Sequence, residues 1–437
     1  MNLPLFIARR VAAGGGRSFS RLILRIAVAA VALSMTVMVV ATSLISGFKT
    51  EIADKIYGFW GDIHITDRAA ASDLSSEVPI STQQDFYPSL DTITSIEYQE
   101  SRTFLGHEYM TVNRTHGGIR HIQQFGIKPG IMFSRTEEEG TIMEGIVLKG
   151  IGPDFDWDFL SRYITAGDPL DATADSLSSD ILISEQTALR LRRQVGEKVL
   201  INFVERTGEM PKRVMTIRGL YRTGLEEYDR QFALIDIRHI QRINGWEPDQ
   251  VNGFEVFIDD KRDLDAYDNY IHYDPLPIEL YAESIRHKQP DLFDWLDIQD
   301  VNEAVILTLM LLVALINMVT ALLILILERT NMIGILKALG QSDWSIRGVF
   351  LYYAAYILIL GLFWGNLLGL GVCWLQDTFG IVRLDEESYY LSVAPVDVDW
   401  GVVLLLNVGT IAVTLLFLVI PSYLVSRVDP VRAIRFK

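Results

Sequence analysis

The apolar stretch "VILTLMLLVALINMVTALLILIL" (305–327) decides the class of fold. Sixteen of its residues are Val, Ile or Leu. At roughly −0.5 kcal/mol each, they favour insertion into a bilayer by about 8 kcal/mol, which outweighs the cost of Asn317 and Thr320. A helix of about 20 apolar residues crosses roughly 30 Å of hydrocarbon. The stretch therefore predicts a membrane-spanning helix.

Three further windows have the same character, at 22–45, 349–375 and 402–425. Four such windows in one chain favour membrane spans over buried helices of a soluble core. The first window is longer than the apolar part of a signal peptide, so we interpret it as an uncleaved span. The single cysteine, Cys373, lies inside the third window, which excludes an intrachain disulfide.

Basic residues near the ends of the spans predict the orientation of the chain. They gather in the N-terminal tail, in the loop between spans two and three, and in the C-terminal tail: Arg9, Arg10, Arg17, Arg21 and Arg25, then Arg329, Lys337 and Arg347, then Arg427, Arg432, Arg435 and Lys437. The loop between spans three and four is acidic instead. Both termini are therefore expected in the cytoplasm of a multi-pass inner-membrane protein.

The long segment 48–300 is then expected outside, and it carries 45 acidic and 26 basic residues. Runs of β-branched and aromatic residues predict strands, at 61–66, 180–184, 198–204, 213–221, 231–237 and 253–258. Residues 185–195 have a helical pattern, with Ser184 as the N-cap and Gly196 as the stop. The predicted fold class is four transmembrane helices with a large, two-lobed α+β domain between helices one and two.

Signatures of catalysis are missing from the sequence. The chain has no Gly-Lys dipeptide, which excludes a P-loop, and no HExxH, CxxC or GxSxG pattern. We therefore predict no catalytic residue, no metal site and no cofactor. The acidic outer segment argues against nucleic acid as a partner.

A short amphipathic helix is predicted between spans two and three. Met332, Ile333, Leu336 and Leu339 share one side at helical spacing. Gly340 is expected to end this helix, and Ser342 is expected to cap the next one. The helix either lies on lipid headgroups, with Lys337 near anionic lipid, or fits a groove on a cytoplasmic protein.

The segment "ERTNMIGILKALG" (328–340) resembles the coupling segment of the FtsX-like permeases. These are membrane subunits of mechanotransmission-type ABC transporters, a group that includes MacB and the lipoprotein-releasing permeases LolC and LolE. The ending "PSYLVSRVDPVRAIRFK" (421–437) is similar to the family's tail, with matches at Pro421, Asp429, Pro430, Ala433 and Arg435. The likeness covers nearly the whole chain and is greatest for the LolC/LolE type.

The resemblance implies a permease that pairs with a second permease copy or paralogue and with a cytoplasmic ABC ATPase, which hydrolyses the ATP. Its cargo would be a lipoprotein, extracted from the inner membrane and passed to a periplasmic carrier. Residues implied at the ATPase-coupling helix are Glu328, Arg329, Met332, Ile333, Leu336, Lys337, Leu339 and Gly340. The alternatives are a MacB-like tripartite efflux permease and an FtsX-like regulator of a cell-wall hydrolase. A receptor that only signals is a further alternative.

Small residues in two spans suggest close helix packing. Gly361, Gly365 and Gly369 form a stripe in span three, which packs either within one subunit or at a dimer seam. Ser34, Thr42 and Ser43 in span one line either a cavity for acyl chains or an ordinary helix contact.

These features predict a division of the chain into nine segments. In order they are a cytoplasmic segment (1–21), span one (22–47), the periplasmic domain (48–300), span two (301–327), the coupling helix (328–348), span three (349–375), a periplasmic loop (376–400), span four (401–425) and a cytoplasmic tail (426–437).

Overall fold

The computed structural model describes residues 18–70, 78–104, 107–136, 140–173, 177–204, 210–385, 389 and 391–427. The chain divides into two compact units. The helical unit comprises 1–51, 295–383 and 393–437, and the β-rich unit comprises 52–294 and 384–392. Most of the predicted N-terminal segment, and the tail positions Asp429, Pro430, Ala433 and Arg435, lie outside the described residues.

Four helices within the described residues are long and apolar enough to cross a membrane, and they fall at the four predicted spans. They are α2 (Ser18–Trp60), α9 (Pro290–Glu328), α11 (Asp343–Phe379) and α13 (Trp400–Ser422), with the short α10 (Thr330–Ala338) between α9 and α11 and a 3₁₀ turn, η5 (Tyr423–Arg427), after α13. The helix α2 continues past the predicted end of span one, because no proline interrupts it and the chain leaves the helical conformation only at Gly61, whose φ is +77°.

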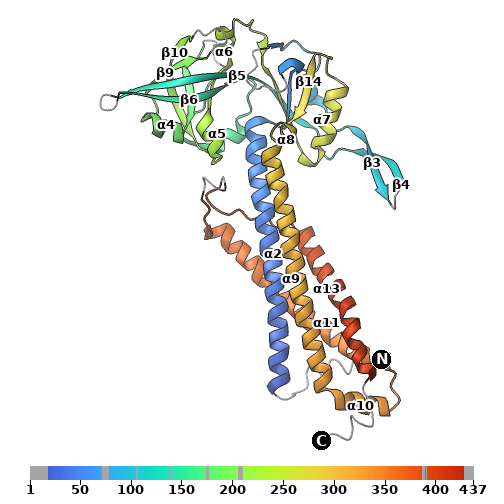
Figure 1. Cartoon of the computed structure of the whole chain (residues 1–437). Helices are drawn as coiled ribbons and strands as arrows, with labels where there is room; N and C mark the ends of the chain where they lie inside the picture. Colours follow the sequence, from blue (N-terminus) through green and yellow to red (C-terminus); the bar gives the residue numbers. More distant parts are fainter. Residues whose placement is uncertain are drawn as a thin grey trace. The chain divides into compact units, whose positions relative to one another are not determined.

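All these helices contribute side chains to an apolar core of the helical unit. Figure 1 shows α2 and α9 running beside each other in this unit. Met35 of α2, Met318 of α9 and Phe350 of α11 are all buried in the core. A pair of amides adds a polar contact between α11 and α13: Nδ2 of Asn366 donates to Oδ1 of Asn407 at 2.8 Å, and Nδ2 of Asn407 donates back at 3.1 Å. Each of these partly buried amides therefore satisfies the other between the two helices.

The β-rich unit contains strands from both halves of segment 52–294. They are β1 (Ile63–Asp67), β2 (Ile80–Ser81), β3 (Glu97–Phe104), β4 (His107–Arg114), β5 (Ile119–Thr136), β6 (Gly140–Ile151), β7 (Ile164–Gly167), β8 (Asp180–Ser184), β9 (Lys198–Phe203), β10 (Lys212–Tyr221), β11 (Phe232–Asp236), β12 (Gln250–Val251), β13 (Gly253–Ile258) and β14 (Leu280–Ser284). The helices are α3 (Trp157–Leu160), α4 (Glu185–Leu191), α5 (Glu226–Gln231), α6 (Ile237–Asn244), α7 (Leu264–Tyr273) and α8 (Ile285–Lys288).

Ten of these strands form one sheet in the order β14-β1-β13-β5-β6-β11-β8-β10-β7, with β9 beside β10 and β5. Most pairs are antiparallel, but β11 runs parallel to β6 and β10 runs parallel to β8. The strand β6 pairs over its full length with β5, in register from Phe125 opposite Ile151 to Thr136 opposite Gly140, and the two strands form a long hairpin. A large α+β domain is thus present, and its location in the periplasm stays a prediction.

The six predicted strands correspond to β1, β8, β9, β10, β11 and β13, the other strands were not predicted, and one helix prediction was wrong at its end. The observed β8 and β13 have the predicted bounds, and Ser184 caps α4 by accepting from the amide of Thr187. The helix ends at Leu191 instead of continuing to Gly196, because Arg192 adopts a left-handed conformation with φ of 52°. The amide of the next residue, Arg193, donates to the carbonyl of Ala188 at 2.9 Å, which closes the end of the helix.

The last turn of α2 lies within the β-rich unit and is capped there by a buried lysine. Nζ of Lys149 donates to the carbonyl oxygen of Phe59 at 2.5 Å and lies 2.7 Å from Oε1 of Glu255. Nε2 of Gln123 donates to the other carboxylate oxygen of Glu255 at 2.7 Å. Burial lowers the pKa of Lys149 and raises the pKa of Glu255, since it disfavours both charges. Each charge is therefore maintained by the other.

We predict that Lys149→Met lowers the free energy of unfolding by about 3–5 kcal/mol at neutral pH, because it leaves Glu255 charged and unpaired. A buried carboxyl with a raised pKa binds more protons in the folded state than in the unfolded state. The loss of unfolding free energy in Lys149→Met should therefore become smaller as the pH is lowered below neutral. It should become larger as the pH rises through the pKa of Glu255 in the folded variant. Thermal unfolding of the purified full-length chain at several pH values measures this.

The matched control is Lys198→Met, which removes an exposed lysine from β9 and should change stability by less than about 0.5 kcal/mol. The double variant Lys149→Met/Glu255→Leu should recover most of the loss, because it removes both charges. Equal stability of Lys149→Met and Lys198→Met would show that the buried pair does not stabilise the unit.

Candidate functional site

The junction between α10 and α11 has the geometry that its sequence predicts. The amide of Gly340 donates to the carbonyl of Lys337, and that of Gln341 donates to the carbonyl of Leu336, both at 3.0 Å. These two backbone hydrogen bonds end the helix with Gly340 in the left-handed region, with φ of 84°, where glycine is favoured. Ser342 then caps α11 through its hydroxyl. The predicted helix stop and the predicted cap are both confirmed.

One side of α10 packs against the chain's own spans. Ile333 is fully buried and belongs to the core of the helical unit, and Met332 and Leu336 pack against the same core. Gly334 beside them is buried as well. Three of the four apolar residues that the sequence assigned to one contact surface therefore stabilise the attachment of α10 within the chain.

Basic side chains tie α10 and α11 to the turn η5. Nζ of Lys337 donates to the carbonyl oxygen of Ser426 at 2.9 Å and pairs with Asp343 at 3.0 Å. Nε of Arg347 donates to the hydroxyl of Ser426 at 3.0 Å, and its guanidinium lies 4.7 Å from the ring centroid of Tyr423. Because the side chain of Lys337 is only 11% exposed, it serves this internal contact.

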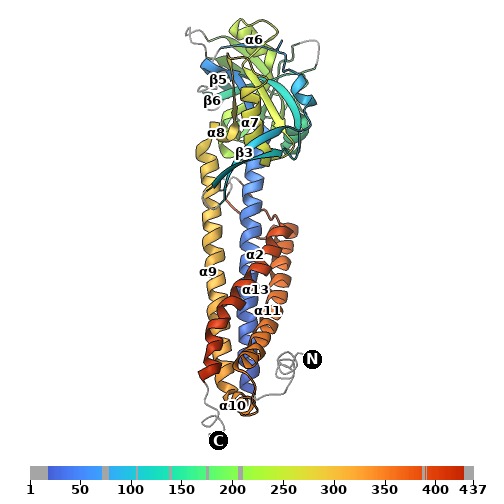
Figure 2. The same cartoon turned by 90° about the vertical axis from the view of Figure 1, so that its right-hand side faces the viewer.

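The opposite side of α10 is exposed and apolar. Ile335 is 48% exposed and Leu339 is 77% exposed, one helical turn apart. Trp344, at the start of α11, is 68% exposed. We call Ile335, Leu339 and Trp344 the outer patch; Figure 2 shows its helix, α10, at the end of the helical unit. Our sequence prediction included Leu339 but missed Ile335, although the i, i+4 spacing of the two residues was a visible signal.

Glu328 and Arg329 lie where α9 ends and α10 begins. Glu328 is the last residue of α9 and is exposed. The amide of Arg329 still donates to the carbonyl of Leu325 at 3.1 Å, and its own carbonyl accepts from the amide of Ile333 at 3.0 Å. The chain therefore passes from α9 to α10 with almost no loss of backbone hydrogen bonds.

The glycine stripe of α11 is occupied by α2 of the same chain. A Cβ added at Gly361 would lie 2.6 Å from Cγ1 of Val31, and one added at Gly365 would lie 2.6 Å from Cβ of Met35. At Gly369 the nearest atom, Cβ of Val39, would be 3.1 Å away. The stripe thus lets two helices of one subunit approach closely.

The small polar residues of span one are buried between helices. Ser34, Thr42 and Ser43 are 2%, 7% and 2% exposed. The hydroxyl of Thr42 donates to the carbonyl of Met38 at 2.8 Å, and the carbonyl of Ser43 accepts from the amide of Asp397 at 3.0 Å. Their surroundings are those of an ordinary helix contact, and a cargo-facing role for them stays a prediction.

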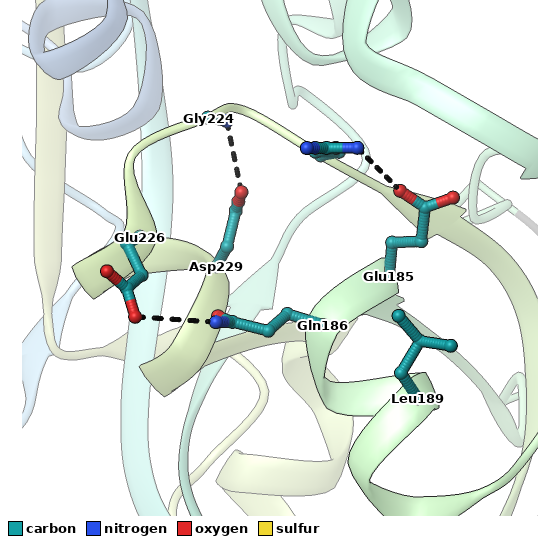
Figure 3. A pocket seen from close by; sticks show the side chains of 7 residues that line it. Glu185, Gln186, Leu189, Gly224, Glu226 and Asp229 are labelled. Carbon is teal, nitrogen blue, oxygen red and sulfur yellow. Dashed lines mark hydrogen bonds and ion pairs between the residues drawn. The ribbon is translucent and has the colours of Figure 1, made fainter. Parts of the chain in front are cut away.

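A cavity of about 240 Å³ lies in the β-rich unit between α4 and the loop that follows β10 (Figure 3). Glu185 pairs with Arg222 at 3.6 Å, and Nε2 of Gln186 lies 3.5 Å from Oε1 of Glu226. The polar side chains around the cavity therefore bind each other. Within the described residues, no group of three or more His, Cys, Asp or Glu is arranged to hold a metal ion.

Asp229, at the floor of this cavity, fixes the loop after β10. One carboxylate oxygen accepts from the amide and the hydroxyl of Thr223 at 3.0 and 2.7 Å, and the other accepts from the amide of Gly224 at 3.0 Å. Burial raises the pKa of Asp229. The segment around it is therefore explained by loop structure, and the cavity does not require a ligand.

Residues 304–430 match the FtsX-like permease C-terminal family. This range begins inside α9 and includes α10, α11 and α13, so it contains both the outer patch and the glycine stripe. The chain therefore contains a domain similar to that of the FtsX-like permeases, and this match together with the relatives below supports an ABC transporter permease.

Over most of its length the chain is similar to lipoprotein-releasing system transmembrane proteins. It is 23% identical to LolC of Xylella fastidiosa over 93% of this chain and 92% of that protein. It is 21% identical to LolC of Neisseria meningitidis, over 96% and 95% of the two chains. It is 22% identical to LolE of Haemophilus influenzae, over 99% of both.

The extracellular domain of the noncanonic ABC-type transporter YknZ from Gram-positive bacteria is a solved structure that the chain also matches. The match has 11% identity and a TM-score of 0.30, over 51% of this chain and 98% of that one. A TM-score of this size does not define a shared fold.

We predict that Gly365→Ala lowers stability by about 1–3 kcal/mol, because the added methyl group overlaps Met35 in a packed core. The control is Gly371→Ala on the same helix, where an added Cβ meets nothing within 4 Å. Both substitutions remove the backbone flexibility of a helical glycine. The difference between their effects on stability therefore measures the overlap with Met35 alone. Thermal unfolding in detergent measures it, and equal midpoints would contradict close packing at Gly365.

Proposed function

We propose that this chain is the permease subunit of a mechanotransmission-type ABC transporter that releases lipoproteins from the inner membrane to a periplasmic carrier. One observation carries the proposal. The likeness to LolC and LolE covers both the spans and the β-rich unit, at 92% or more of each relative. The chain itself is non-catalytic in this proposal, and a separate cytoplasmic ATPase supplies the energy.

An ATP-driven transporter is needed because acyl chains hold a lipoprotein in the membrane. The acyl chains of a lipoprotein contain dozens of methylenes, and each contributes about 0.8 kcal/mol to membrane binding. Spontaneous release is then negligible, so extraction must be driven by ATP. A contact between the ATPase and this permease is therefore required on the cytoplasmic side, where we place both termini and α10.

We assign that contact to the outer patch. A helix with one side packed in its own protein and the other side apolar and exposed is suited to a groove on a partner. Ile335 and Leu339 supply the anchoring side chains, and Trp344 extends the surface toward α11. Ile333, Met332 and Leu336 hold α10 to the spans, so that motion of the helix reaches them.

We predict that Leu339→Asp or Ile335→Asp reduces co-purification of the ATPase with the full-length permease at least about tenfold. A charge placed in an apolar groove without a partner costs several kcal/mol. The control is Asn331→Asp, which adds the same charge at a polar, exposed position one turn earlier. If both patch variants retain the ATPase while α10 loses its attachment to lipid, the helix lies on headgroups instead.

We also predict that depletion of this protein strands acylated lipoproteins in the inner membrane, where they accumulate because their anchors cannot leave it unaided. Separation of inner and outer membranes, followed by mass spectrometry of lipoproteins, measures the distribution. Normal delivery of lipoproteins together with increased sensitivity to drugs or peptides would replace this function with that of an efflux permease.

A further inference from the structure

A second cavity lies in the helical unit, between α2 and the end of α11. Its volume is about 230 Å³, and Val40, Leu44, Val372, Leu375 and Val396 are among its lining residues. An apolar cavity of about 150 Å³ is large enough to hold a benzene molecule in a protein interior. This cavity therefore has room for a flexible hydrocarbon segment.

The polar groups of the lining are already bonded to the protein. Nε2 of Gln376 donates to the carbonyl oxygens of Val382 and Ala394 at 3.1 and 2.9 Å, and its Oε1 accepts from the amide of Val382 at 2.8 Å. The thiol of Cys373 interacts with the hydroxyl of Ser43. A buried water needs two to four polar partners, and these groups are engaged elsewhere, so the cavity favours an apolar occupant.

The loop that completes the cavity is attached firmly to α2. The amide of Asp397 donates to the carbonyl of Ser43 at 3.0 Å, and the hydroxyl of Ser46 donates to the Asp397 carboxylate at 3.2 Å. A Cβ at Gly47 would lie 2.8 Å from the carbonyl oxygen of Pro395, so the loop lies directly against the helix. Together with the amide of Gln376, these contacts give the cavity a preformed wall.

We propose that this cavity binds one alkyl chain of an acylated lipid. Its two helices are long and apolar enough to cross a membrane, so hydrocarbon is the medium around them. Val372 is 46% exposed and Val382 is 49% exposed, which leaves an apolar entrance on the side of α11. The chain comes either from a bilayer phospholipid or from the anchor of a lipoprotein, and the second source rests on the proposed function.

Photo-crosslinking in proteoliposomes tests the proposal. The full-length protein is reconstituted with a phospholipid that carries a diazirine at the tail end of one acyl chain, and labelled peptides are mapped after irradiation. We expect enrichment of label at least about fivefold in the segments that contain Val372 and Val382, relative to the exposed Leu367 and Leu368 of the same helix. A uniform distribution over the lipid-exposed positions would overturn the proposal.

Two matched variants control for general effects of bulk. Leu44→Trp fills the cavity and should remove the enrichment, whereas Leu368→Trp makes the same exchange on the exposed side of α11 and should preserve it. If Leu44→Trp does not fold, Val372→Phe reduces the cavity from the other helix. Gln376→Met should lower the label near Val382, because the loop loses its three hydrogen bonds to the amide. Unchanged label in Leu44→Trp would again overturn the proposal.

Competition with a synthetic triacylated lipopeptide separates the two sources. Displacement of the phospholipid label shows that the cavity accepts a lipoprotein anchor, and a label that resists displacement shows a resident bilayer lipid. Both outcomes support an alkyl-chain site. Failure of lipoprotein sorting to depend on this protein would reject the proposed function but leave the crosslinking result intact.

Discussion

Backbone groups at buried helix ends have no water to bind, and this constraint shapes both units of the structure. The last carbonyls and first amides of a helix lack partners within the helix. The end of α2 is satisfied by Nζ of Lys149 on the carbonyl of Phe59 and by Nε2 of His64 on that of Trp60, at 2.5 and 2.6 Å. The loop after α11 relies on the amide of Gln376. These side chains are buried because the backbone groups they satisfy are buried.

At the end of α2, the buried lysine that caps the helix needs further buried polar partners of its own. A buried lysine cannot stay charged without a counter-charge, so Glu255 lies beside it, and Gln123 in turn satisfies the remaining oxygen of Glu255. Aromatic rings complete the surroundings: Nζ of Lys149 lies 5.0 Å from the ring centroids of both Phe59 and Trp60. The polar groups deep in the β-rich unit thus form a connected set.

Local sequence patterns predicted the spans, several strands and the two caps at Gly340 and Ser342, because each depends on a few neighbouring residues. The long hairpin of β5 and β6 was missed. Pro129 and Gly130 interrupt the alternation expected of a strand, and pairing with β6 and β9 overrides that local preference. The role of Lys149 could not be predicted, since its partners Phe59 and Glu255 are about a hundred residues away on either side.

The short helix α10 illustrates a different limit of sequence-based prediction. Apolar residues lie on more than one side of α10, and periodicity does not say which of them the chain itself buries. Ile333 and Leu339 have the same character in the sequence, yet one is fully buried and the other is 77% exposed. Only the position of the spans distinguishes them, so the predicted contact surface had to be divided between internal packing and the outer patch.

Ser426 accepts hydrogen bonds from both Lys337 and Arg347, and this has a mechanical consequence. Ser426 links α10 and the start of α11 to η5, the turn that follows α13, while Ile333 links α10 to the core that α9 shares. A load applied to α10 is therefore distributed over three spans in parallel. Such an arrangement resists bending of any single helix and turns a local push into a concerted displacement of the bundle.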